Sequence, residues 1–289
     1  MRTQLAAADF SWPGVRQEFV FDLLAELGFA AADLGLWTGY TMVTPEDVRT
    51  DIAGSARRTR AALESRGLEV SDVFPVASML LAPRSVNHPD AGERRAADEF
   101  FREMLDYAAQ LGARHMTILP GVLHEGQGYR GALEGSAEGL RWRLEEARSA
   151  GIELAIEGHV GSHVDTPEKI LELLELVPGL TLTLDFGHFA VQGMPDERAY
   201  PLIAHASHFH VRGCAGGLVQ TRFKDNAIDF AAIVRHFAEL DYRGWLALEY
   251  VHDDRPGCSE CDNIQETILF RDFLQDRLAE LTAGAPSAT

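Results

Sequence analysis

Short apolar runs alternate with amphipathic stretches along nearly the whole chain. The runs are almost continuously hydrophobic, which is typical of parallel strands that are buried on both faces. Eight runs have the length expected of such strands: Gln4–Ala8, Ala31–Leu36, Glu69–Phe74, His115–Leu119, Glu153–Glu157, Thr181–Asp185, His208–Val211 and Leu246–Tyr250.

The segments between these runs have helical spacing and helix-end signals. Thr44-Pro45-Glu46 and Thr166-Pro167-Glu168 each combine an N-cap threonine, a proline at the first helical position and an acidic first turn. Glycines such as Gly28 and Gly112 follow the last apolar positions, where a helix commonly ends. The predicted helices are Gly14–Leu27, Thr44–Arg66, Ala91–Leu111, Ser136–Ala150, Thr166–Leu176, Glu197–Ala206, Ile228–Leu240 and Asn263–Leu281.

This alternation predicts an α/β protein, and the eight strand–helix units favour a (β/α)8 TIM barrel over an open doubly wound sheet. The chain has 289 residues, close to the ~250 that one such barrel needs. Two smaller domains would also fit the length alone. We predict a single barrel over residues 1–282 and a frayed tail over 283–289. No GxGxxG follows the first strand and no GxxxxGK[ST] occurs, so the marks of dinucleotide and P-loop folds are missing.

Composition and charge exclude several classes of partner. The formal net charge is −18, which disfavours nucleic acid and anionic membrane surfaces because both attract Lys and Arg. No signal-peptide pattern and no run of about 18 apolar residues occurs, so we expect a cytoplasmic protein without membrane spans. The three cysteines suggest no disulfide framework. Cys258 and Cys261 form a CxxC without a second pair, which favours ordinary loop thiols over a structural zinc site.

Metal-competent side chains close four successive strands in the second half of the chain. Glu157 ends strand five, Asp185 ends strand six, His210 lies on strand seven and Glu249 ends strand eight. The C-terminal ends of barrel strands meet at one mouth, where active sites lie. Glu249 stands in an apolar run, where an ionised carboxylate without a partner is costly. The four residues therefore predict one divalent-metal site.

The donor set limits which metal is expected. Three carboxylates and one imidazole suit Mn²⁺ best, with Mg²⁺, Co²⁺ and Zn²⁺ as alternatives. No cysteine is placed to favour zinc, and the HExxH motif of zinc proteases is absent.

The stretches IEGH, LDFGH, HFHVRG and DYRGWLALEY resemble the xylose isomerase-like superfamily, and the resemblance spans nearly the whole chain. It implies a TIM barrel whose metal ligands are Glu157, Asp185, His210 and Glu249. It also implies that Glu157 and Glu249 are the catalytic acid/base pair. His188, three residues after the strand-six aspartate, matches the substrate-binding histidine of the family.

Other substrate contacts are less closely matched. The arginine that the epimerases carry six residues after the strand-seven histidine corresponds to Gly216, so Arg212 or Arg222 must replace it. We favour Arg222, because its segment is expected to overhang the pocket. His124 follows strand four and is a further candidate substrate contact. His208 shares the side of the strand with His210, and we expect it one layer deeper, as support for a ligand or as a core residue.

The resemblance implies an isomerase or epimerase that works through an enediolate by proton transfer between two glutamates. A lyase that expels a group from the same enolate remains the alternative. A nuclease of the endonuclease IV type is disfavoured because strand three ends without a histidine and no DxH follows strand seven. The intact ligand set also disfavours a non-catalytic barrel.

The expected substrate is a small unphosphorylated ketose, keto-polyol or keto acid, because no phosphate cradle follows strands seven or eight. The loop His252–Asp262 is longer than a simple turn. It either shapes specificity or forms the contact of a homodimer.

Overall fold

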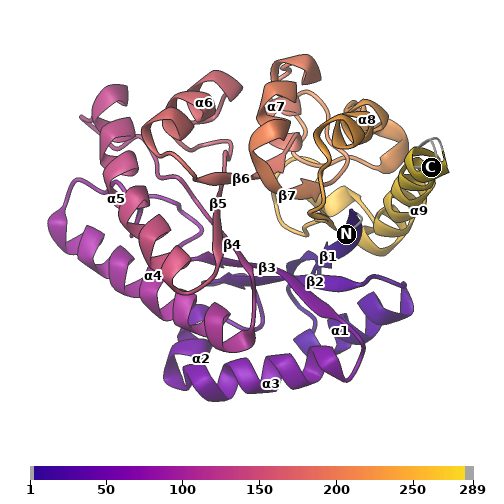
Figure 1. The fold of residues 1–289 in the computed structure, drawn as a ribbon, viewed down its shortest axis with the longest axis horizontal. Coiled ribbons are helices and arrows are strands. Elements are labelled where there is room, and N and C mark those ends of the chain that lie inside the picture. Colours follow the sequence, from indigo (N-terminus) through magenta and orange to yellow (C-terminus); the bar gives the residue numbers. More distant parts are fainter. Residues whose placement is uncertain (1–2, 284–289) are drawn as a thin grey trace, which may run out of the picture.

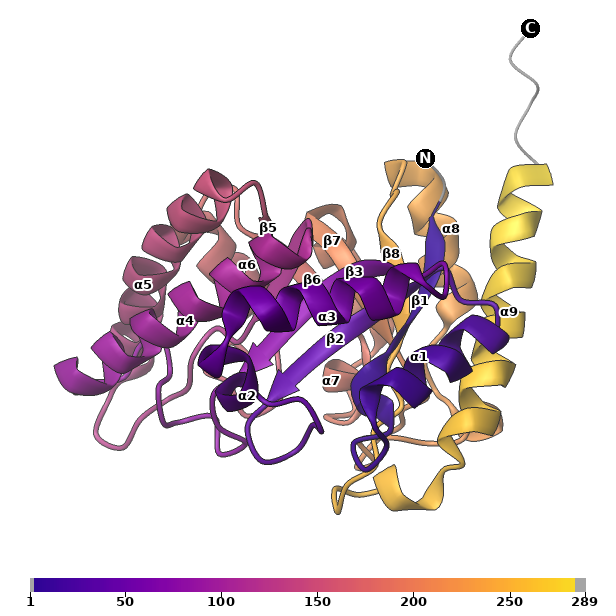
Figure 2. The same cartoon turned by 90° about the horizontal axis from the view of Figure 1, so that it is seen from below.

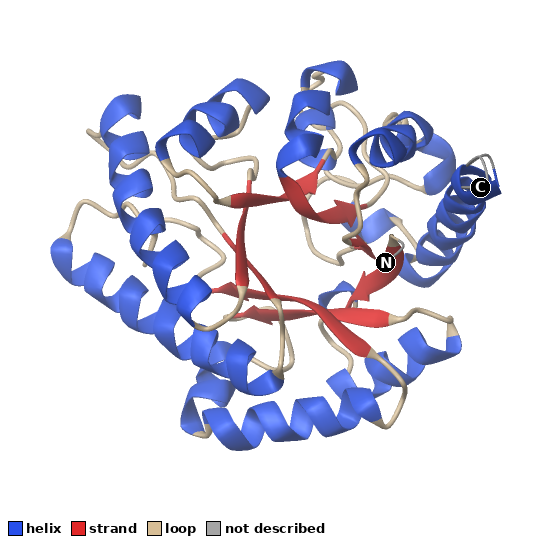
Figure 3. Ribbon diagram, in the orientation of Figure 1, coloured by secondary structure: helices blue, strands red, loops and turns tan. Residues whose placement is uncertain are grey.

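The computed structural model describes residues 3–283, in which eight parallel strands close into a barrel in chain order. β1 pairs with both β2 and β8, which completes the ring (Figures 1 and 3). The predicted (β/α)8 barrel is confirmed. Its strands are β1 Gln4–Ala8, β2 Ala31–Trp37, β3 Glu69–Val76, β4 His115–Ile118, β5 Glu153–Glu157, β6 Thr181–Asp185, β7 Ala206–Val211 and β8 Trp245–Leu248.

The predicted bounds of β1, β5 and β6 are confirmed, and those of the other strands differ by one or two residues at one or both ends. β8 ends at Leu248, so Glu249 lies one residue beyond the strand rather than inside it. Its backbone nevertheless continues the pairing, since the amide of Glu249 donates to the carbonyl of Val211 over 3.0 Å. The side chain of Glu249 is therefore held at the rim of the barrel.

Helices surround the barrel on its outer face (Figure 1). The prediction of one helix over Thr44–Arg66 is wrong: at Asp51 the backbone leaves the helical region, and its carboxylate accepts from the amide of Gly54 to begin a new helix. The helices are α1 Gln17–Glu26, α2 Pro45–Thr50, α3 Ile52–Glu64, α4 Ala91–Leu111, α5 Tyr129–Ser149, α6 Pro167–Leu176, α7 Gly187–Ala190, α8 Phe230–Leu240 and α9 Asn263–Ala283.

Two further segments differ from the secondary structure that was predicted for them. The stretch expected as a helix over Glu197–Ala206 forms two 3-10 helices, Asp196–Arg198 and Tyr200–His205. The short α7 directly follows β6 and was not expected. The predicted frayed tail lies outside the described residues, except that Ala283 ends α9.

The barrel interior is unusually polar. TIM barrels normally fill this space with branched apolar side chains, but here three imidazoles stand one above another. The ring of His115 lies 5.2 Å from that of His208, and His208 lies 5.5 Å from His210. We call these three residues the imidazole column. The column leads from the N-terminal end of the barrel toward its mouth.

The side view places the mouth at the lower edge, toward which the arrowheads of β2 and β3 point (Figure 2). The loops that follow the strands gather there. None of the helices within residues 3–283 combines the length and apolar character needed to cross a bilayer.

Candidate active site

Three of the four predicted metal ligands meet at the barrel mouth. Nδ1 of His210 lies 2.7 Å from Oε1 of Glu157 and 2.9 Å from Oε2 of Glu249. One ligand atom from each of these residues lies within 4.8 Å of the others. All three side chains are buried. One nitrogen and two carboxylate oxygens are thus gathered around a single point.

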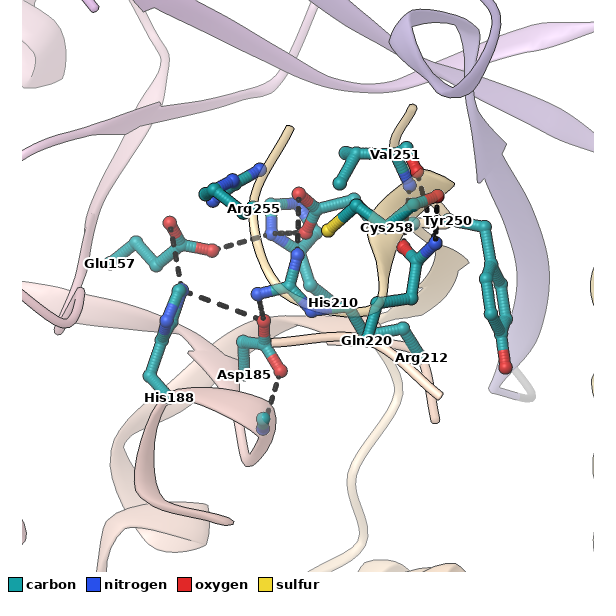
Figure 4. Close-up of polar contacts among 12 residues, drawn as sticks. Glu157, Asp185, His188, His210, Arg212, Gln220, Tyr250, Val251, Arg255 and Cys258 are labelled. Carbon is teal, nitrogen blue, oxygen red and sulfur yellow. Dashed lines mark hydrogen bonds and ion pairs between the residues drawn. The ribbon is translucent and has the colours of Figure 1, made fainter. Parts of the chain in front are cut away.

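The fourth predicted ligand, Asp185, lies beside this group and is held by other partners. Its Oδ2 is 2.8 Å from Nη2 of Arg212, and its Oδ1 accepts from the amide of Gly187 over 2.7 Å. Nη1 of Arg212 also lies 3.5 Å from Oε1 of Glu249 (Figure 4). Arg212 follows β7 directly and is 1% exposed. A buried guanidinium therefore spans two of the predicted ligands.

His188 joins the group from α7. Its Nε2 lies 3.6 Å from Glu157 and 3.5 Å from Asp185, so one imidazole bridges the ends of β5 and β6 (Figure 4). The ring of His159 stacks against it, with 4.2 Å between the ring centroids. Burial, and secondarily the charge of His188, lowers the pKa of His159 to about 3, so this ring is neutral at physiological pH.

Sequence reasoning missed Asp33, which lies inside the barrel on β2. Its Oδ2 is 2.7 Å from Nε2 of His208 and 3.3 Å from Nε2 of His210, while Oδ1 accepts from Ser71. A carboxylate on the far nitrogen of a histidine fixes its orientation and raises its basicity. His208 thus lies one layer below His210, as expected. The signal for Asp33 was available, because it too is a carboxylate in an apolar strand.

The electrostatics of the cluster are dominated by its carboxylates. Burial by itself raises the pKa of Glu157, but hydrogen bonds to His188 and His210 outweigh burial and hold the pKa well below its usual range. For the imidazole of His210, burial by itself lowers the pKa. The charge of Glu249 and the contacts with Asp33 and Glu157 outweigh burial and raise the pKa far above its usual range. Positively charged side chains of the protein thus balance the carboxylates of the cluster.

Even so, the cluster leaves several buried polar atoms without a well-directed hydrogen bond. Some of them, such as Oδ2 of Asp185, are close enough for an ion pair without the geometry of a hydrogen bond. An unmatched polar group in the interior calls for a missing partner. A divalent cation with oxygen and imidazole ligands fits this arrangement. The two carboxylate oxygens among these atoms, Asp185 Oδ2 and Glu249 Oε2, are the ones that a cation can satisfy; the other atoms are His188 Nδ1, His210 Nε2 and the donor Arg212 Nε.

Two predicted substrate contacts point elsewhere. Arg222 forms an ion pair with Asp225 over 2.9 Å, and its side chain is 54% exposed. His124 shares a hydrogen bond of 2.8 Å with Ser85, and its ring meets that of His88 edge to face. The contacts found for these residues within the described chain do not include the carboxylates of the cluster. The arginine that contacts these carboxylates is Arg212.

The long loop after β8 contributes a residue that was not predicted. Arg255 is drawn at the edge of the cluster beside Glu157 (Figure 4), and its charge lowers the pKa of His159. Asp253 pairs with it over 2.6 Å. Cys258 of the same loop is buried under Gln220, whose amide donates to the Cys258 carbonyl over 3.3 Å. These contacts hold the loop against the mouth.

Comparisons with known proteins agree with this architecture. The sequence model of the xylose isomerase-like TIM barrel family matches residues 21–272. The inosose dehydratase of Geobacillus kaustophilus is 24% identical over 295 residues, covering 86% of this chain and 88% of that protein.

Two solved structures superpose over almost the full length. D-psicose 3-epimerase from Clostridium cellulolyticum, solved with D-tagatose, gives a TM-score of 0.77 at 15% identity, covering 96% of this chain and 99% of the other. An L-ribulose 3-epimerase gives 0.76 at 18% identity, covering 99% and 100%. At such identities the likeness shows a shared fold.

Proposed function

Because the chain belongs to the xylose isomerase-like TIM barrel family, we propose that it is a divalent-metal-dependent isomerase or epimerase of a small unphosphorylated sugar or keto-polyol. Glu157 and Glu249 are the acid/base pair, and Mn²⁺ is the expected metal. Sugar epimerases among the solved structures of similar fold support the reaction class.

One observation carries this proposal. Glu157 and Glu249 approach the same nitrogen of His210, over 2.7 and 2.9 Å, from strands on either side of β7. Two buried carboxylates thus border one small space from two directions. A substrate carbon held between them can lose a proton to one carboxylate and regain a proton from the other.

The chemistry follows from these positions. A divalent metal held by Glu157, His210 and Glu249, with Asp185 as the fourth ligand, would polarise a substrate carbonyl and the adjacent hydroxyl and acidify the α-proton. One glutamate takes that proton, and the substrate becomes an enediolate. Return of a proton to the opposite face of the same carbon gives an epimer, and return to the neighbouring carbon gives an isomer.

Arg212 and His188 have supporting roles. The guanidinium of Arg212 is fixed between Asp185 and Glu249, so it supplies a preorganised positive charge beside the developing enediolate. Nε2 of His188 faces Glu157 and Asp185, where it can donate to a substrate oxygen. Both side chains are buried, so neither has to reorganise during the reaction.

A dehydratase on the same site is the second candidate. The sequence similarity to an inosose dehydratase favours it. Loss of a β-hydroxyl from the enolate needs a proton donor near the leaving oxygen. Nε2 of His188 lies 3.6 Å from Glu157, in a position to supply that proton.

Proton exchange with solvent tests the proposal directly. The Mn²⁺-loaded protein is incubated in D₂O with a panel of ketoses, keto-polyols and 3-keto sugars, and the products are analysed by NMR. We expect deuterium next to the carbonyl, abolished by EDTA, and the product separates isomerase from dehydratase. Absence of exchange across the panel would count against enolate chemistry on these compounds.

Two glutamates of one strand provide a matched pair of variants. Glu157→Gln should lower turnover by about 10²–10⁴-fold, the usual contribution of a general acid or base. Glu153→Gln, at the exposed start of the same strand, should leave turnover unchanged. Equal activity of the two variants would remove Glu157 from the mechanism.

A further inference from the structure

An apolar cavity opens next to the cluster, outside the group of predicted ligands. It lies at the C-terminal ends of β3, β4 and β5, between the barrel and α4, and the segment 77–86 roofs it. Its volume is about 70 Å³, which is below the ~300–1,000 Å³ usual for the site of a whole small molecule and leaves room for one small apolar group. Apolar side chains that line it include Val76, Leu81, Val86, Phe100, Phe101 and Ile118.

The cavity adjoins the active site at His159, which forms part of its wall. This residue lines the cavity on one side and stacks on His188 on the other, with 4.2 Å between the rings. His188 in turn lies 3.6 Å from Glu157. A substrate that reacts at the glutamates therefore has an open apolar space only two stacked rings away.

Two residues in the roof of the cavity have a strained backbone conformation. Leu81 and Arg84 both line the cavity, and both have left-handed φ values, of 61° and 54°. Non-glycine residues in this region are strained and persist only where the surroundings fix them. The amide of Arg84 donates to Glu93, and Ser85 bonds to His124. His124 therefore helps to hold the segment that roofs the cavity.

Two arginines line the cavity, and the charge of one of them is paired within the protein. Arg143 lines the cavity, but its guanidinium pairs with Asp98 over 2.9 Å and lies over the ring of Phe101. Its charge is therefore already balanced within the protein. The remaining polar lining consists of serine hydroxyls, His159 and the roof residue Arg84. A phosphate group would find no built cradle here, whereas an apolar group would be surrounded by hydrocarbon.

We propose that this cavity is a substrate subsite for an apolar substituent, an aryl or alkyl group carried by the sugar. The inference rests on the proposed function and narrows it: the substrate is a substituted sugar or keto-polyol rather than a free one. The reacting carbons sit between the two glutamates, and the substituent passes His159 into the cavity.

A series of metal-chelating probes tests this inference without knowledge of the substrate. Acetohydroxamate, butyrohydroxamate and hexanohydroxamate share one chelating head and differ only in alkyl length. Their binding to the Mn²⁺-loaded protein is measured by titration calorimetry. We expect affinity to rise about fourfold per methylene, since burying one CH₂ contributes about 0.8 kcal/mol.

Two alanines of the roof segment provide the variant and its control. Ala77 lines the cavity, whereas Ala82 is not among the lining residues, and both are half-buried. Ala77→Phe should fill the cavity and remove the dependence on chain length while acetohydroxamate still binds. Ala82→Phe should keep the full dependence.

The outcomes separate the subsite from the proposed function. If acetohydroxamate binds but longer chains gain nothing in the unaltered protein, the subsite is overturned and the metal site stands. If Ala82→Phe loses the dependence as fully as Ala77→Phe, the cavity is not where the chains bind. If no hydroxamate binds, the metal site fails and the subsite with it.

Discussion

Both ends of the barrel hold buried carboxylates and histidines, but the hydrogen bonding of these side chains differs between the two ends. Near the N-terminal end, Nδ1 of His115 lies 2.7 Å from Asp72 and its Nε2 lies 2.8 Å from Ser207. Ser207 also bonds to Thr181 over 2.8 Å. Both ring nitrogens of His115 are thus matched by the protein itself.

At the mouth, several polar atoms of the same residue types have no hydrogen-bond partner within the protein. Glu157, Asp185 and Glu249 crowd around His210 and Arg212, and five polar atoms of this cluster and His188 lack a well-directed hydrogen bond. A buried charge is tolerated only when paired and hydrogen-bonded. In the group around His115 only Oδ2 of Asp72 lacks a hydrogen bond, whereas the mouth gathers five such atoms and leaves them for a ligand to complete.

Removal of the buried guanidinium should have the largest effect. Arg212→Met leaves Asp185 and Glu249 without their shared cation, and losing one partner of a buried ion pair typically costs about 3–5 kcal/mol. We expect a loss of this size in the unfolding free energy measured by urea denaturation in EDTA. Excess Mn²⁺ should restore part of the loss, because a ligand that binds only the folded state stabilises it.

Arg143→Met is the matched control. Arg143 is equally buried, but its partner Asp98 has a side chain that is 37% exposed and can be solvated. We expect a smaller loss and no greater response to Mn²⁺ than in the unaltered protein. If Mn²⁺ stabilises both variants alike, the argument that Arg212 neutralises a metal site fails.

A pair of aspartates sharpens the comparison further. Asp33→Asn weakens the carboxylate behind His210, and loss of such a partner typically lowers metal affinity about 10–100-fold. Asp72→Asn alters the network around His115 at the other end of the barrel and should leave Mn²⁺ affinity unchanged. Titration calorimetry with Mn²⁺ measures both, and equal affinities in the two variants would contradict a role for Asp33 in orienting His210.

The most gradual expected effect, spread over several pH units, concerns a third kind of carboxyl. Asp9 follows β1, is 7% exposed, and has only neutral partners, the amides of Gln17 and Gly35. Burial raises its pKa to about 7, from 3.8. Between these two pH values the unfolded chain ionises Asp9 while the folded protein keeps it protonated, so stability falls as pH rises and levels off above 7.

Asp9→Asn removes this proton linkage. The unfolding free energy of the unaltered protein, taken relative to the variant, should therefore fall by at most about 1.4 kcal/mol per pH unit between pH 4 and 7. Urea denaturation at a series of pH values measures the difference. A difference that is independent of pH would mean that Asp9 ionises normally in the folded protein.

The sequence by itself determined the barrel and the positions of the predicted ligands. Strand and helix periodicities are local signals, and parallel strands of a closed barrel end at the same mouth whatever their loops do. Glu157, Asp185, His210 and Glu249 follow from that rule alone. Arg212, the alternative to Arg222 in the sequence analysis, lies two residues after His210 and so shares its side of the strand.

Only the tertiary structure decided which further side chains join the cluster. Asp33 and His208 are 175 positions apart in the chain, and no local pattern states that their side chains meet across the barrel. Arg222 and His124 lie in loops, where the direction of a side chain depends on nearby partners such as Asp225 and Ser85. The apolar cavity likewise exists because separate loops and helices pack around it, and packing is a property of the whole fold.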